Sequence, residues 1–144
     1  MKAKLLDDQG GKTFAVVFDT GDEVASGLLA FARKYRLAGS HFTAIGAFEG
    51  ATLGYFDWQQ KDYQKIPVRE QVEVLSLVGD ISLDEKGEPK VHAHVVVGRF
   101  DGTALGGHLL EARVRPTLEV ILVESPKHLR RRYDPESKLA LIQL

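Results

Sequence analysis

The chain has 144 residues, of which 44% are hydrophobic and 27% are charged, and its formal net charge is −1. This composition is that of a folded protein rather than a disordered one, and the length predicts one domain over residues 1–144. The small net charge excludes a long-range field that would draw the whole molecule to nucleic acid or to anionic lipid. There is no cysteine, which excludes disulfides and thiolate metal sites and leads us to expect a reducing compartment, the cytoplasm. We expect no signal peptide and no membrane span, because no apolar run approaches the ~20 residues that cross a bilayer.

The first part of the chain predicts a strand followed by a helix. Residues Thr13–Phe18 form a short apolar run between glycines and turn residues, which is typical of a buried strand. Between Asp22 and Leu37 the apolar residues recur at intervals of four, three and four, which predicts a helix. Thr20 or Asp22 is expected to cap its start, and Gly39 is expected to end it.

After the helix, alternating apolar residues predict a mostly antiparallel sheet. Residues 42–48 and 51–57 flank Glu49-Gly50 as a possible hairpin, and further strands are expected at 71–83, 91–97, 103–110 and 117–123, with short ones at 63–66 and 139–142. Within Gln71–Leu83, strict alternation places Val72, Val74, Ser76 and Val78 on one face and Glu73, Leu75, Leu77 and Gly79 on the other. The predicted fold is therefore α+β, with one main helix on a central sheet of about seven strands.

Three of the five histidines lie between Val91 and Glu111, where the pattern predicts a β-hairpin. Asp101-Gly102 supplies residues that tolerate the positive φ of a tight turn. His92 and His94 point to one face of the first strand, since side chains alternate along a strand. If the residue numbers of paired positions sum to 200 or 202, His108 lies directly opposite one of them on the same face.

Three imidazoles gathered on one face predict a site for zinc or another divalent transition metal. Neutral imidazole is a common zinc ligand, and three protein ligands with a fourth position left to water are typical of an open or catalytic site. Gly106 and Gly107, next to His108, would let a ligand or another backbone come close. The alternative is that the histidines are polar residues of a solvated sheet face, satisfied by ordinary hydrogen bonds.

Glutamates near the hairpin are candidates for a general base, or for orienting a metal-bound histidine through its second nitrogen. They are Glu73, Glu111 and Glu119. We favour Glu73, which lies among apolar neighbours, although a strand glutamate is more often a surface residue.

Two further features have a functional and a structural interpretation. The basic segment Lys127–Arg132 could contact phosphates, although short runs of charge are usually solvated or lie in oligomer contacts. Tyr55, Phe56 and Trp58 could stack on a base or line a pocket, although packing is the commoner role of aromatic residues. His41 and His128 have no partner with ligand spacing.

Several longer motifs carry a family resemblance. They are F-T-A-I-G-A-F-E-G-A-T-L-G-Y-F-D, V-E-V-L-S-L-V-G-D-I-S-L, V-H-A-H-V-V-V-G, D-G-T-A-L-G-G-H-L-L-E-A-R-V and T-L-E-V-I-L. With them the sequence resembles the PPC domain family (plants and prokaryotes conserved), which also forms the globular part of plant AT-hook nuclear proteins. The resemblance implies an α/β fold with a central antiparallel sheet, a homotrimer, and zinc ligands at His92, His94 and His108. Plant members bind DNA through a separate R-G-R-P hook, and this chain has none.

Three functions follow as hypotheses. The first is a metal-binding protein, with a metal-dependent enzyme of unknown substrate as one form of it. The second is a DNA-binding regulator without an AT-hook, which would use the basic segment. The third is an assembly module, in which the homotrimer is the function and the metal is structural.

Overall fold

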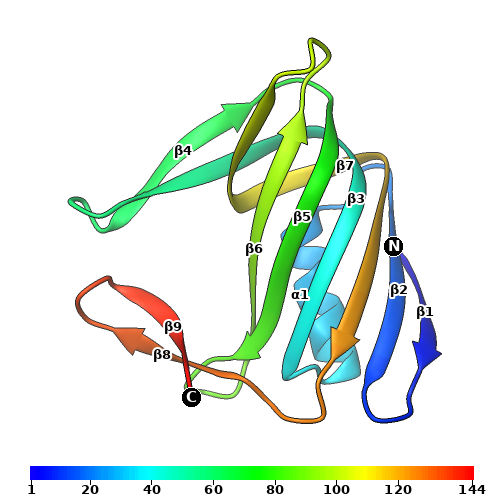
Figure 1. Cartoon of the computed structure of the whole chain (residues 1–144), viewed down its shortest axis with the longest axis vertical. Coiled ribbons are helices and arrows are strands. Elements are labelled where there is room, and N and C mark those ends of the chain that lie inside the picture. Colours follow the sequence, from blue (N-terminus) through cyan, green and yellow to red (C-terminus); the bar gives the residue numbers. More distant parts are fainter.

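A computed structural model describes all 144 residues, with one helix and nine strands in a single sheet (Figure 1). The helix is α1 (Val24–Tyr35), and the strands are β1 (Lys2–Asp7), β2 (Lys12–Asp19), β3 (Gly39–Asp57), β4 (Asp62–Val68), β5 (Val72–Leu83), β6 (Pro89–Gly98), β7 (Ala104–Glu124), β8 (Arg130–Asp134) and β9 (Leu139–Gln143). One helix and mostly antiparallel pairing are confirmed, since the only parallel contact joins Leu83 to Arg130. The sheet has nine strands, not about seven.

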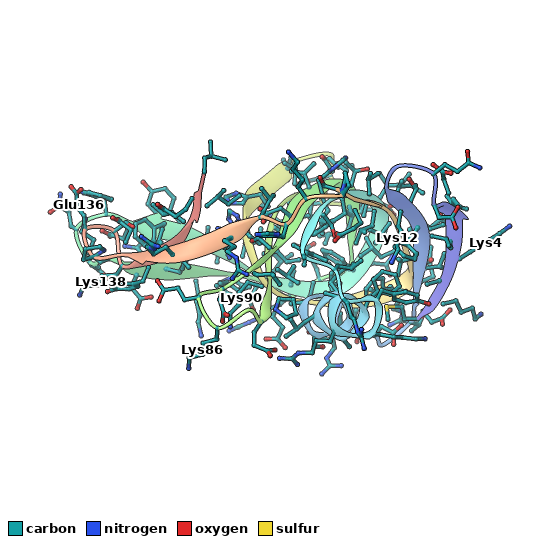
Figure 2. All side chains as sticks on the ribbon, turned by 90° about the horizontal axis from the view of Figure 1, so that it is seen from below. Lys4, Lys12, Lys86, Lys90, Glu136 and Lys138 are labelled. Atoms are coloured by element: carbon teal, nitrogen blue, oxygen red, sulfur yellow. The ribbon has the colours of Figure 1, made fainter.

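Four of the strands pair in a closed ring, which gives the sheet an inner and an outer face. β3 pairs with β5, β5 with β6, β6 with β7, and β7 again with β3. The inner face is apolar and α1 packs on it, so that Phe31, Phe42, Leu77 and Val95 belong to one core cluster. β1 and β9, the first and last strands in the order of the sheet, lie at opposite ends of the molecule, as Lys4 of β1 and Lys138 beside β9 show (Figure 2).

The two longest strands are each continuous where the sequence predicted a break. β3 runs through Glu49-Gly50 without a hairpin, because shifts of register along it bend the strand instead of reversing it. β7 joins the predicted strands 103–110 and 117–123 and passes through Pro116. Arg115 and Pro116 have no partner in either neighbouring ladder, so the missing N–H of proline breaks no hydrogen bond there.

A bulge in β5 overturns the predicted assignment of faces in that strand. The register with β6 shifts between Val74 and Ser76. Beyond the shift, Leu77 and Ile81 are buried and Val78 is exposed, so strict alternation was wrong after Val74. The same shift turns Asp80, which pairs with His92, to the outer face of the ring. The bulge therefore decides which residues face the histidines.

The helix ends also differ from those predicted. Glu23, rather than Thr20 or Asp22, caps the start, and its carboxylate accepts hydrogen bonds from the N–H groups of Ala25 and Ser26. Arg36 takes the left-handed conformation that ends the helix, before Gly39 is reached. With only 12 residues, α1 is not a helix that could cross a membrane.

Candidate metal centre

The predicted histidine hairpin is confirmed, with one of the two predicted registers. His94 of β6 pairs directly with His108 of β7, so that the paired numbers sum to 202. His92 lies two residues along β6 on the same face. On the opposite face of the strand, Ala93 and Val95 are buried in the core. Core packing on one side thus fixes all three imidazoles on the other.

The three rings converge on one point. Their ligand nitrogens all lie within 4.8 Å of one another, and the Nε2 atoms of His92 and His94 are 3.2 Å apart. Zinc–nitrogen bonds of 2.0–2.1 Å in a tetrahedral site place ligand atoms about 3.3 Å apart. The spacing of the two Nε2 atoms therefore suits a shared cation.

His108 carries a buried nitrogen that no group in the protein satisfies. Its Nδ1 is buried and has no hydrogen-bond partner. Burial, followed by the nearby His92, His94 and Arg131, lowers the pKa of His108 to about 4. An unsatisfied buried polar group costs about 1–3 kcal/mol. A buried imidazole nitrogen without a protein partner leaves room for an ion or water to satisfy the ring, and together with the converging nitrogens it fits a metal ion.

The electrostatics favour the form of histidine that binds metals. Burial, with a smaller contribution from His92, also lowers the pKa of His94. Metals bind the neutral imidazole, so a low pKa reduces competition from protons. His94 and His108 are therefore ready as ligands near neutral pH.

Behind His92 lies an ion pair that sequence reasoning did not predict. The Nδ1 atom of His92 is 3.5 Å from Oδ2 of Asp80 and 3.2 Å from Nη2 of Arg131. Burial alone would raise the pKa of Asp80, but hydrogen bonds from His92 and Arg131 and the charge of Arg131 lower it overall. Asp80 is thus an anion that can orient His92.

An aromatic side chain supports His108 from the other side. The ring of Tyr63, on β4, stacks on His108 with ring centroids 4.6 Å apart. A side chain at Gly54 would be excluded, because its Cβ would lie 2.8 Å from Cδ1 of Tyr63. Phe56 lies edge-on to Tyr63 and to Trp58. Two of the aromatic residues that the sequence singled out, Phe56 and Trp58, therefore pack in a row that leads from Tyr63 along the β3–β4 hairpin.

The site therefore lies between two hairpins. β3–β4 supplies Tyr63 and β8–β9 supplies Arg131, and both hairpins project on the same side of β6 (Figure 1). Neither residue had a sequence signal of its own. Tyr63 lies in a short polar strand, and Arg131 is one of three consecutive arginines.

The predicted glutamates lie elsewhere on the sheet. Glu73 is exposed and pairs with Gly98, four residues along β6 from His94, which is about 13 Å at the rise of a strand. Glu111 pairs with Thr52, and Glu119 pairs with Ile45 and Val17. This distance is too long for one water to bridge, so a role for Glu73 as a base needs a ligand that extends along β6.

The remaining residues that the sequence singled out differ in how close they lie to the histidine site. A Cβ at Gly107 would lie 2.8 Å from the carbonyl oxygen of Gly54, so the close approach there is to the β3 backbone, whereas Gly106 has ordinary space. His41 pairs with Asp80 but is not among the nitrogens that converge. Within the basic segment, Arg131 is buried and the flanking Arg130 and Arg132 are exposed.

Comparison with known proteins places the chain in a family. The model of the Plants and Prokaryotes Conserved (PCC) domain matches residues 6–126. The chain belongs to this family. The resemblance predicted from the motifs is thereby confirmed, whereas a comparison with curated proteins gave no match.

Solved structures of this family have the same fold. A plant- and prokaryote-conserved protein of Pyrococcus horikoshii is 30% identical with a TM-score of 0.85, over 99% of this chain and 95% of that one. A metal-containing protein of Archaeoglobus fulgidus is 32% identical with a TM-score of 0.85, over 98% and 99%. A protein of Ralstonia eutropha described as a candidate DNA-binding protein is 30% identical with a TM-score of 0.86, over 98% and 96%.

The low pKa of His108 predicts how the metal-free protein responds to acid. Unfolded His108 takes up a proton at its ordinary pKa of 6.5, whereas folded His108 does so only at about 4. The unfolded state therefore binds more protons within this window, and the stability falls as the pH falls from about 6.5 to about 4. Urea denaturation in the presence of a chelator at pH 7, 5.5 and 4.5 measures this loss. The variant His108→Gln should lose less stability over the same window, and an identical loss in both proteins would contradict the prediction.

Proposed function

We propose that this PCC-domain protein binds one zinc ion, or another divalent transition metal, through His92, His94 and His108. The observation that carries the proposal is the convergence of their ligand nitrogens within 4.8 Å. The buried, unpartnered Nδ1 of His108 supports it. So does the similarity to a metal-containing protein of Archaeoglobus fulgidus that is 32% identical.

Three histidines leave one coordination position open, which is the form of catalytic rather than structural zinc sites. A zinc ion held this way would lower the pKa of a bound water or polarise a carbonyl or phosphoryl oxygen. The side chains of this chain would hold the ion and orient its ligands, through Asp80 at His92 and Tyr63 at His108. We therefore favour a metal-dependent function over a purely structural metal.

Removal of one ligand tests the metal site. We expect the wild-type chain to bind about one zinc ion, and His94→Ala to lower the affinity by at least about 100-fold, more than the usual effect of a residue that only supports a ligand. Chelator competition measures the affinity, and elemental analysis measures the zinc content per chain.

His41→Ala is the matched control, because His41 lies on the outer face in the row of Asp80 and His92 but outside the converging group. It should leave the affinity unchanged. Zinc content that survives the loss of all three histidines would contradict the site.

We also propose that the chain assembles as a homotrimer, as the family resemblance implies. The outer face of the ring exposes apolar side chains near the histidines, which an interface between copies would cover: Ile45, Leu75, Val78, Val96 and Ile121. Light scattering in solution should give three times the 15.9 kDa of one chain. Val78→Lys should lower this mass, and a monomeric wild-type protein would contradict the assembly.

A second candidate function is DNA binding. It is favoured by the similarity to the candidate DNA-binding protein of Ralstonia eutropha and by the exposed Lys127, Arg130 and Arg132. If these residues contact phosphates, affinity for duplex DNA falls with salt, and each neutralised contact lowers the slope by about 0.9. Fluorescence anisotropy of wild type and of a variant with glutamine at all three positions measures this. Equal slopes would contradict a role for the basic segment.

A further inference from the structure

Arg131 is the buried member of three consecutive arginines. Alternation along β8 turns Arg130 and Arg132 to solvent and Arg131 to the sheet, where it is only 9% exposed. The strand itself joins the sheet through a single bridge, between Leu83 and Arg130. The β8–β9 hairpin also lies beyond residues 6–126, which the family model matches.

The guanidinium of Arg131 connects this hairpin to the residues behind the metal centre. Its Nε donates to Oγ of Ser82 at 2.7 Å, and its Nη1 donates to the carbonyl oxygen of Ala140 at 2.8 Å. Its Nη2 lies 2.9 and 2.8 Å from the two oxygens of Asp80. An arginine bound on all three nitrogens is held in one orientation, so it holds Asp80 in one orientation as well.

His92 meets both members of this ion pair at one atom. Its Nδ1 lies 3.2 Å from Nη2 of Arg131, a donor, and 3.5 Å from Oδ2 of Asp80, an acceptor. When the Nε2 lone pair faces a cation, neutral His92 carries its hydrogen on Nδ1, which then donates to Asp80. In the other tautomer, Nδ1 accepts from Arg131, and the hydrogen on Nε2 lies toward His94 at 3.2 Å. The pair thus satisfies His92 in either tautomer.

We propose that Arg131 is a positioning residue of the metal centre: it fixes Asp80, which in turn holds the ring of His92 with Nε2 toward the ion. This inference rests on the proposed zinc site. It makes the β8–β9 hairpin part of that site, although no residue of the hairpin is a metal ligand. Because coupling is reciprocal, zinc binding also stabilises the docked hairpin.

The test compares zinc affinity in three proteins by chelator competition at pH 7.5. Loss of a residue that supports a metal ligand weakens binding by about 10–100-fold, and we expect this for Arg131→Gln. Arg131→Lys keeps the charge but cannot reach Ser82, Asp80 and Ala140 together, so it should restore the affinity only in part. Arg132→Gln, an exposed neighbour on the same strand, is the control and should bind as wild type does.

A second readout separates positioning of His92 from a general loss of structure. In zinc-loaded protein, the Nδ1–H resonance of His92 should exchange slowly with water in wild type and faster in Arg131→Gln. Circular dichroism checks the fold, and if Arg131→Gln does not fold, Ser82→Ala replaces it. This change removes the acceptor of Arg131 Nε and also the hydrogen bond that Ser82 Oγ donates to Oδ1 of Asp80 at 3.2 Å. Ser82→Ala should also weaken zinc binding, by less than Arg131→Gln.

The outcomes separate the two proposals. Folded variants that bind zinc as wild type does, with unchanged exchange of the His92 proton, would overturn the role of Arg131 and leave the zinc site standing. Wild-type protein that binds no zinc would instead contradict the proposed function itself.

Discussion

The pairing of His94 with His108 across β6 and β7 is the constraint on which the candidate centre depends. A slip of β6 by one residue would turn His92 and His94 to the inner face, among the side chains of the core, and leave His108 alone on the outer face. Burial of Ala93, Val95 and Val97 on that inner face opposes the slip, because each would have to move to the solvent side. The hydrophobic core thus sets the geometry of a polar site on the other side of the same strand.

The site also depends on irregularities in its neighbours. The bulge in β5 brings Asp80 to the histidine face, and the bends of β3 and β7 close the ring of strands that presents β6 and β7 side by side. Two hairpins then contribute one residue each, Tyr63 against His108 and Arg131 against Asp80. Residues from five strands therefore surround a point that only two strands would supply with ligands.

Sequence reasoning found the three candidate ligands but not the residues that support them, for physical reasons. Alternation along a short strand and an Asp-Gly turn predict the hairpin, since both signals are local. The placement of Asp80, in contrast, depends on an extra residue at Val74–Ser76, which alternation cannot show. Arg131 was hidden in a basic segment because its burial comes from a contact with Ser82, 49 positions away in the chain. The glutamate favoured from sequence, Glu73, has apolar neighbours in sequence but an exposed position on the sheet.

X-ray absorption of the zinc-loaded wild-type protein tests the central claim most directly, because it reports the atoms bound to the ion. Our account predicts three imidazole nitrogens and one further light atom at about 2.0–2.1 Å. A zinc ion bound only by oxygen atoms, or by a single imidazole, would contradict it.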